Sequence, residues 1–303
     1  MKSRADTPSL AILNGFGRSL GDGIIGLQAL RAGQSLGLLP RATLVRRFDF
    51  GPMVNALYDH VQDFADLAEL DESLATTPPP ELTPEFRRQN PNIIDIRDFA
   101  FDPDFRGVAM IDFFLRRLGI APETVPQALL RNTWLAPRIT PVRPSGLPER
   151  YVLFCPRASM ALRDMPAASQ ARLLDIIAAS QPWPIITQGE ALPGAIPIGH
   201  LPSLSELCGL VANAALIVST DTGMLHLADA FGVSCFAIFT THRPDWRVRD
   251  YPLCTPHALP VQGLPPALEF QRGPEDLNAI EQAWIDGSQA LDAALGNWLD
   301  QNG

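Results

Sequence analysis

The feature that most limits the fold of this chain is a regular alternation of short apolar runs and helical stretches in its second half. The runs YVLFC, WPIIT, LIVS and VSCFAIF have the length of strands. The stretches 166–180, 203–214 and 223–231 between them are expected to be helices. Uninterrupted apolar strands that alternate with helices are typical of a parallel sheet covered by helices. The second half therefore predicts an α/β domain.

The first half begins with the same pattern. The apolar run 9–16 and the run 42–45 are expected to be strands, and a helix is expected after the glycine-rich turn 17–23. Residues 71–92 are rich in proline and acidic residues and predict a surface loop, whereas 110–118 has helical spacing. A β–loop–α–β start of this kind predicts a second domain of the same class.

Four prolines between residues 137 and 148 predict a stiff, extended segment between the two domains. We expect a first domain of residues 1–140, a linker of 141–150 and a second domain of 151–303. Residues 274–303 are expected to form one helix, which either packs on the second domain or crosses back to the first. The apolar stripe of this helix consists of Ile280, Trp284, Leu291, Leu295 and Trp298.

Composition and charge argue against several classes of protein. The net charge of −9 disfavours nucleic acid as a partner. No run approaches the ~18 uninterrupted apolar residues of a membrane-spanning helix, and the polar N-terminus lacks the apolar core of a secretory signal. The four cysteines form no CxxC pair, which favours reduced thiols in the cytoplasm. The D-x-D pattern at 102–104 lies in a proline-broken loop, so we expect no metal there.

The strongest functional signal is the expected strand-to-helix turn 220–223. Free N–H groups and the positive end of the helix dipole make such a turn a ready site for phosphate. Thr222 adds a hydroxyl donor, and Gly223 lets the backbone approach a ligand closely. His226 lies one turn further on the same side. A simpler interpretation stays open, in which Asp221 or Thr222 only caps the helix and His226 is an ordinary core histidine.

The N-terminal glycine-rich loop is compatible with other patterns. Gly17, Ser19 and Gly21 match the G-x-S-x-G nucleophile elbow. However, only sixteen residues precede Gly17, too few for the earlier strand that supplies an oxyanion loop. A dinucleotide-binding fingerprint would need glycine or alanine where Leu20 stands. A third interpretation makes Asp22 an ordinary helix cap.

A longer pattern links the second-half turn to a known family. The sequence fits D-[ST]-G-x-x-H-x-A-x-A-x-G with Asp221, Thr222, Gly223, His226, Ala228, Ala230 and Gly232. In this pattern it resembles glycosyltransferase family 9, the ADP-heptose:lipopolysaccharide heptosyltransferases. Weaker matches bracket the chain in the same order: Ser19-Leu20-Gly21-Asp22, Pro156-Arg157-Ala158-Ser159, Arg163, Met165-Pro166, Glu190, Trp246 and Tyr251.

The resemblance implies a GT-B-like α/β fold, in which two Rossmann-type domains with parallel sheets face a central cleft. It implies an inverting, metal-independent transfer of a sugar, expected to be heptose, from an ADP-sugar to a glycan or other acceptor. Asp22 would be the general base. The implied donor-binding residues are Ser159, Arg163, Glu190, Asp221, Thr222, Gly223 and His226. The implied acceptor-side loop consists of Gly17, Arg18, Ser19 and Gly21.

The sequence departs from the family pattern at three positions. Arg163 stands for the usual lysine, Arg157 for glycine and Met165 for tryptophan, and residues 50–110 match poorly. Two alternatives therefore stay open: a transferase for another nucleotide-activated sugar, and a non-catalytic nucleotide-sugar-binding relative.

The resemblance also sets expectations for partners and location. It implies no cofactor or metal besides the ADP-sugar substrate, and it implies a glycan or lipid-linked acceptor at the membrane surface. The protein would then be cytoplasmic and peripheral at the inner membrane. The sequence does not determine the oligomeric state.

Overall fold

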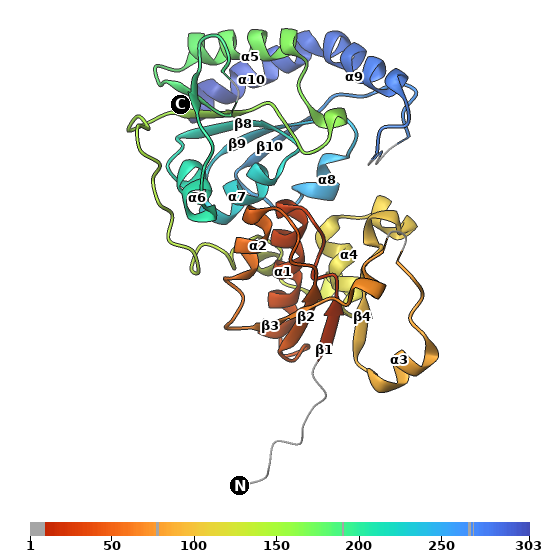
Figure 1. The fold of residues 1–303 in the computed structure, drawn as a ribbon. Helices are drawn as coiled ribbons and strands as arrows, with labels where there is room; N and C mark the ends of the chain where they lie inside the picture. Colours follow the sequence, from red (N-terminus) through yellow and green to blue (C-terminus); the bar gives the residue numbers. More distant parts are fainter. Residues whose placement is uncertain (1–9, 77–78, 190, 266–267, 269) are drawn as a thin grey trace. The chain divides into compact units, whose positions relative to one another are not determined.

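The computed structural model describes the chain except for residues 1–9, 77–78, 190, 266–267 and 269. By its internal contacts the chain separates into two compact units, residues 1–130 and 131–303. Each unit contains a parallel sheet with helices packed on it (Figure 1). The α/β class predicted from the alternating pattern is therefore confirmed in both units.

The first unit is built on a four-stranded sheet of order β3-β2-β1-β4. The strands are β1 (Leu10–Leu13), β2 (Ala42–Arg46), β3 (Ala65–Glu69) and β4 (Ile93–Asp95). The helices are α1 (Leu20–Ser35), α2 (Pro52–Tyr58), α3 (Pro84–Gln89) and α4 (Met110–Arg117). Because the strand order reverses between β1 and β4, the loops after these strands meet where such sheets bind ligands.

Aromatic packing fixes the loop that follows β1. Phe16 contacts Phe114 of α4 edge to face, with ring centroids 5.3 Å apart. Phe99, just after β4, packs on the same Phe114 ring at 5.4 Å. The loop after β1, the segment after β4 and helix α4 therefore share one core.

The second unit is built on a six-stranded sheet of order β10-β9-β8-β5-β6-β7. The strands are β5 (Val152–Cys155), β6 (Ile185–Gln188), β7 (Ile196–Ile198), β8 (Leu216–Thr220), β9 (Cys235–Phe239) and β10 (Cys254–Ala258). The helices are α5 (Ala167–Ser180), α6 (Leu204–Ala212), α7 (Gly223–Phe231), α8 (Pro244–Arg247), α9 (Pro274–Asp286) and α10 (Ser288–Asn302). This is the strand order of a doubly wound sheet, with its reversal between β5 and β8.

Short 3-10 helices occur in both units. They lie at Glu72–Leu74, Phe99–Phe101, Pro103–Arg106, Pro122–Thr124, Gln127–Leu129 and Ala161–Arg163. None of the described helices combines the length and the apolar character needed to cross a bilayer.

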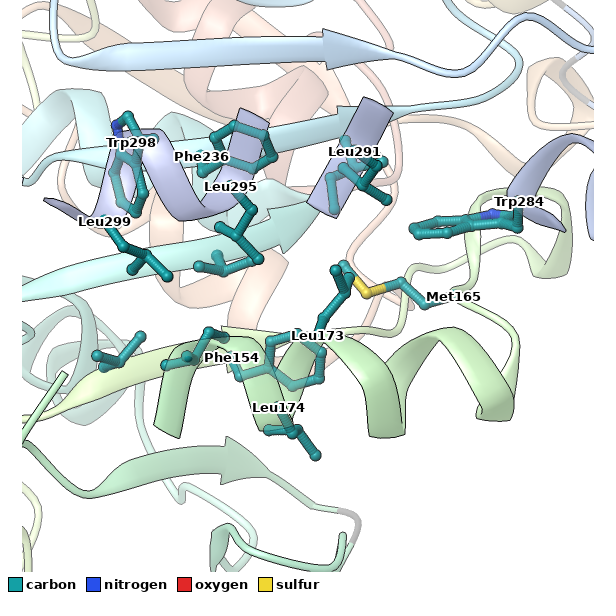
Figure 2. Packing of buried hydrophobic residues seen from close by; sticks show 14 of the residues in the cluster. Phe154, Met165, Leu173, Leu174, Phe236, Trp284, Leu291, Leu295, Trp298 and Leu299 are labelled. Atoms are coloured by element: carbon teal, nitrogen blue, oxygen red, sulfur yellow. The ribbon is translucent and has the colours of Figure 1, made fainter. Parts of the chain in front are cut away.

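The main core of the second unit lies between its sheet and helices α5, α9 and α10 (Figure 2). Phe236 of β9 contacts Trp298 of α10 with ring centroids 5.7 Å apart. The predicted apolar stripe is confirmed, since all five of its residues are buried in this core: Ile280, Trp284, Leu291, Leu295 and Trp298.

The prediction of one C-terminal helix is wrong. The chain forms α9 and α10 with Gly287 between them. A side chain at Gly287 would lie 2.5 Å from Leu259 Cδ2, so the bend brings the backbone close to the core. Helix α10 packs on α5 and β10, within the second unit.

The prediction of a surface loop over 71–92 is wrong for residues 84–89, which form α3. Thr83 caps this helix by accepting a hydrogen bond from Phe86 N at 3.1 Å, and Pro84 occupies the first helical position. Phe86 packs against the buried Leu13 and Leu82. A local cap and one apolar contact thus order a segment whose composition indicates a loop.

The proline-rich segment 141–150 is attached to the second unit. Val142 N donates to Ser205 O at 2.9 Å, and α6 approaches Val142 so closely at Gly209 that no side chain would fit between them. By its internal contacts the chain divides at residue 130. The predicted domain and linker boundaries at 140 and 150 stay a prediction.

Candidate functional site

The loops after β5 and β8 meet at the strand-order reversal of the second sheet. The strands are hydrogen-bonded neighbours, and Cys155 at the end of β5 is paired with Ser219. Arg163, in the loop after β5, donates to Ser159 Oγ at 2.9 Å and lies 3.5 Å from Asp221 Oδ2 after β8. The structure thus brings together three of the predicted donor-site residues. Glu190, a fourth, lies outside the described residues.

Thr222 is the N-cap of α7. Its Oγ1 accepts a hydrogen bond from Met224 N at 3.1 Å, so the capping interpretation of this residue is confirmed. Thr222 Oγ1 also lies 3.4 Å from Ser219 Oγ, which donates its own hydrogen to Thr220 O. Gly223 is the first residue of the helix, and an N–H at that position has no partner inside the helix. The helix therefore begins with donors suited to an anion.

Asp221 does not cap the helix but is the centre of a buried ionic cluster. Its side chain is only 3% exposed and lies 2.9 Å from His242 Nδ1. Burial raises the pKa of Asp221, but the hydrogen bond from His242 and the charges of Arg163 and Arg247 outweigh it, so the pKa lies well below its ordinary value. Asp221 is therefore ionised and holds cations around the turn.

His226 is buried one turn into α7. Its Nδ1 lies 2.7 Å from the Tyr251 hydroxyl. Burial lowers the pKa of His226 to about 4, opposed by Asp221 and supported by Arg247 and Arg163. The imidazole is therefore neutral at pH 7 and carries one N–H. His226 is satisfied at Nδ1, as the core-histidine interpretation expects, yet it lies among the charges of the site.

Several residues of the cluster were not predicted as site residues. His242 and Arg247 follow β9, which pairs with β8 in the sheet. Both are largely buried, with 4% and 7% exposure. The signal available in the sequence was the position of this segment directly after an apolar strand, because such loops gather at one edge of a parallel sheet.

The departures from the family pattern are accommodated in the structure. Met165 is fully buried in the core of the second unit. Arg157 Nη1 lies 3.3 Å from Asp164 Oδ2, and this carboxylate also accepts from Ala158 N at 2.7 Å.

In the first unit, Asp22 lies in the first turn of α1. Ser19 is the cap of this helix, since its Oγ accepts from Asp22 N at 3.1 Å. The interpretation of Asp22 as the helix cap is therefore wrong. Gly21 is buried beside it. The negative charge of Asp22 adds to the effect of burial in raising the Tyr58 pKa, which locates the carboxylate near that ring.

The loop between β1 and α1, which contains the predicted acceptor-side residue Gly17, has an unusual backbone. Asn14, Gly15, Phe16 and Gly17 all have positive φ, at 81°, 53°, 65° and 91°. Non-glycine residues in this region are uncommon, and such strain is concentrated at functional sites. A side chain at Gly17 would lie 2.8 Å from the Phe99 ring, so only glycine fits there. The next residue, Arg18, is exposed with its guanidinium 5.9 Å from the Phe50 ring.

A buried arginine lies beside this loop. Arg46, at the end of β2, is inaccessible to solvent and stacks on the Tyr58 ring at 3.9 Å. Its Nη2 donates to Asn55 Oδ1 at 2.9 Å. Burial lowers the Arg46 pKa, opposed by nearby Tyr58. No sequence pattern pointed to this residue.

The D-x-D pattern is engaged in local structure. Asp102 accepts a hydrogen bond from Asp104 N at 2.9 Å and forms an ion pair with Arg117. In the described part of the chain, no group of three or more His, Cys, Asp or Glu is placed to hold a metal ion.

Comparison with known proteins gives one matching family. The model of glycosyltransferase family 9 (heptosyltransferase) matches residues 199–251, which span α6, β8, α7, β9 and α8. The match includes Asp221, Gly223, His226 and Tyr251. No match was found among curated proteins.

Three solved structures illustrate the likeness of fold. The iron-containing dodecameric glycosyltransferase TibC from enterotoxigenic E. coli H10407 is 15% identical, with 97% of this chain and 76% of TibC covered and a TM-score of 0.65. The E. coli ADP-heptose lps heptosyltransferase II is 14% identical, with 92% and 99% covered and a TM-score of 0.58. The family 9 glycosyl transferase from Veillonella parvula DSM 2008 is 12% identical, with 94% and 98% covered and a TM-score of 0.56.

At these identities the structural likeness concerns the fold, while the family model matches the segment that contains the α7 turn. The matched segment belongs to the family that the sequence pattern resembles. Residues 199–251 of the chain thus resemble glycosyltransferase family 9, and the fold resembles that of solved glycosyltransferases.

Proposed function

We propose that this chain transfers a sugar from an ADP-sugar to the hydroxyl of a glycan or other acceptor, with inversion and without a metal ion. Heptose is the sugar we propose, because TibC has been solved in complex with ADP-D-beta-D-heptose. The observation that carries the proposal is the α7 turn. Arg163 lies within hydrogen-bonding reach of Ser159 and of Asp221, and Asp221 directly precedes the cap of α7.

The diphosphate of the donor would bind at this turn. The Gly223 N–H and the Thr222 hydroxyl are donors at the positive end of α7. Arg163 adds a delocalised cation with five N–H donors, of which Ser159 and Asp221 engage only part. These groups would stabilise the negative charge that develops on the leaving ADP.

The acceptor would be activated by Asp22. In a single displacement, the acceptor oxygen forms a bond to the anomeric carbon while the bond from that carbon to the phosphate oxygen breaks. The acceptor's proton goes to the Asp22 carboxylate, and ADP leaves with the bonding electron pair. What supports Asp22 in this role is its position in the first turn of α1, directly after the implied acceptor-side loop.

The proposal extends to the acceptor. A glycan, or a lipid-linked glycan reached from the cytoplasm at the inner membrane surface, would fit a transferase of this family. No cofactor is proposed besides the ADP-sugar substrate.

Calorimetric titration with ADP tests the donor site. We expect Gly223→Val to abolish binding, because a branched side chain would occupy the place of the phosphate. Arg163→Gln should weaken binding about tenfold or more, the typical effect of losing a hydrogen bond to a charged group. The matched control is Arg150→Gln. Arg150 is exposed and precedes β5, at the amino ends of the strands, whereas the α7 turn lies at their carboxyl ends. Unchanged ADP affinity in Gly223→Val would contradict the proposal.

A further inference from the structure

A chain of short hydrogen bonds connects the first residues of the second unit to the histidine of the donor site. Asn132 Nδ2 donates to the Tyr251 hydroxyl at 2.6 Å. The same hydroxyl lies 2.7 Å from His226 Nδ1. All three residues are buried, with 1%, 7% and 3% exposure, so water does not compete for these bonds. Neither Asn132 nor the direction of these bonds was predicted from the sequence.

The donors and acceptors in this chain have only one consistent order. The Tyr251 hydroxyl accepts from the Asn132 amide and has a single hydrogen of its own to give. That hydrogen points to His226 Nδ1, which must then be the acceptor. A neutral imidazole that accepts at Nδ1 carries its hydrogen on Nε2. Burial keeps the His226 pKa near 4, so the ring is neutral and this order applies at pH 7.

Asn132 is itself held by the helix that carries His226. Asn132 N donates to Asp229 Oδ2 at 2.8 Å, and Arg131 Nε donates to Asp229 Oδ1 at 3.0 Å. Asp229 lies on α7, three residues after His226. The segment and the helix are therefore tied at two points, through the Asp229 carboxylate and through Tyr251. This double attachment fixes where the Asn132 amide lies.

We propose that Asn132 and Tyr251 are positioning residues that hold His226 as its Nε2–H tautomer, so that it donates a hydrogen bond to a phosphate oxygen of the bound nucleotide. The inference rests on the proposed donor site. It assigns to Tyr251 a direct bond to the donor-site histidine and to Asn132 the bond that orients the Tyr251 hydroxyl. A hydrogen bond to a phosphate is favoured by charge and is stronger than one between neutral groups.

The tautomer can be observed directly by nitrogen NMR of the protein labelled with ¹⁵N-histidine, without ligand. We expect His226 in the wild type to show an unprotonated Nδ1 and a protonated Nε2. Asn132→Asp should reverse the order of donors, because a carboxylate at 132 would take the Tyr251 hydrogen and leave the oxygen to accept from Nδ1–H. Tyr251→Phe should remove the bond to Nδ1 and shift that resonance.

ADP titration of the same variants gives the functional result. We expect Tyr251→Phe and Asn132→Asp to weaken ADP binding about tenfold, with melting curves that confirm a folded protein. The matched control is Tyr151→Phe, which removes another buried hydroxyl of the second unit, the one that donates to Leu210 O at 2.5 Å. It should leave both the His226 signals and the ADP affinity unchanged.

The outcomes separate this inference from the proposed function. A wild-type protein that does not bind ADP would overturn the proposed function. Wild-type ADP binding together with a protonated Nδ1 on His226 would overturn the inference alone. The inference would also fail if folded Tyr251→Phe bound ADP as tightly as the wild type.

Discussion

Two aspartates at helix starts have opposite surroundings, and this difference separates their roles. Asp221 is buried and faces His242 and Arg163, so its charge is used to hold the site together. Asp22 is only partly buried and lies in the first turn of α1, whose cap is supplied by Ser19. The partly buried carboxylate, directly after the implied acceptor-side residues, is the one that we propose for proton transfer.

This assignment predicts that Asp22→Asn nearly stops sugar transfer but leaves ADP affinity intact. The amide keeps the shape of the acid but takes up no proton, so the rate should fall by the ~10²–10⁴-fold that general-base catalysis contributes. Because Ser19 caps α1, the melting temperature should hardly change. Ser203→Ala, which removes the cap of α6, is the converse control, with about 1 kcal/mol less stability and near-normal turnover. Turnover of Asp22→Asn within about threefold of the wild type would move the base elsewhere, for example to Asp98.

At this scale, the sequence could predict the residues of the α7 turn but not their partners. Asp221, Thr222 and Gly223 form one local pattern, in which the residue types alone indicate a helix start that binds phosphate. His242 and Asn132 reach the turn only through the strand order, and Asn132 is 119 residues from its partner Tyr251. Their residue types do not differ from those of ordinary loop residues, so only the fold identifies them.

At the scale of elements, helix α1 lies close to the loop that precedes it because Gly26 has no side chain. Gly26 faces the buried ring of Phe16, and a methyl group at Gly26 would overlap that ring. Phe16 has little freedom to move, since it has a φ of 65° and packs on Phe114. The close approach of α1 to the strained loop therefore depends on the absence of a side chain.

Gly26→Ala is therefore expected to destabilise the protein, by roughly the 1–3 kcal/mol of an overpacked core. In an open helical position the same change stabilises by about 0.5–1 kcal/mol. Gly296 in α10 is such a position, because nothing lies within 4 Å of a side chain built there. Chemical denaturation of Gly26→Ala and Gly296→Ala should therefore give free-energy changes of opposite sign. A stabilised Gly26→Ala protein would contradict the close packing of loop and helix.

An element could be predicted where its own residues determine it, but not where contacts with distant residues do. Strands β5, β8 and β9 are buried throughout, and continuous apolar runs indicate such strands well. Strands β7 and β10 are largely exposed at the two edges of the sheet and contain a proline each, so neither alternation nor hydropathy reveals them. The break between α9 and α10 depends on contact with Leu259, which helical spacing alone does not contain.

At the scale of the whole molecule, both units repeat one topological device. In each sheet the first strand, β1 or β5, lies beside the strand where the order reverses, β4 or β8. The candidate base follows β1, and the candidate donor residues follow β5 and β8. The candidate base and the candidate donor residues therefore both follow the carboxyl ends of strands at the reversal of strand order. Doubly wound proteins bind ligands at this position.

This arrangement leads to a prediction about metal ions, because the proposed charge stabilisation comes from the protein itself. Arg163 and the N-terminus of α7 would act on the leaving diphosphate, so transfer should continue after dialysis against EDTA. A variant that lacks the arginine provides the complementary experiment. Arg163→Gln should lose most of its turnover, and added magnesium, manganese or ferrous ion should not restore it. A metal-dependent glycosyltransferase assayed in the same buffer would show that chelation is complete. If EDTA abolished wild-type turnover and one of these ions restored it, a metal would supply the charge that we assign to Arg163.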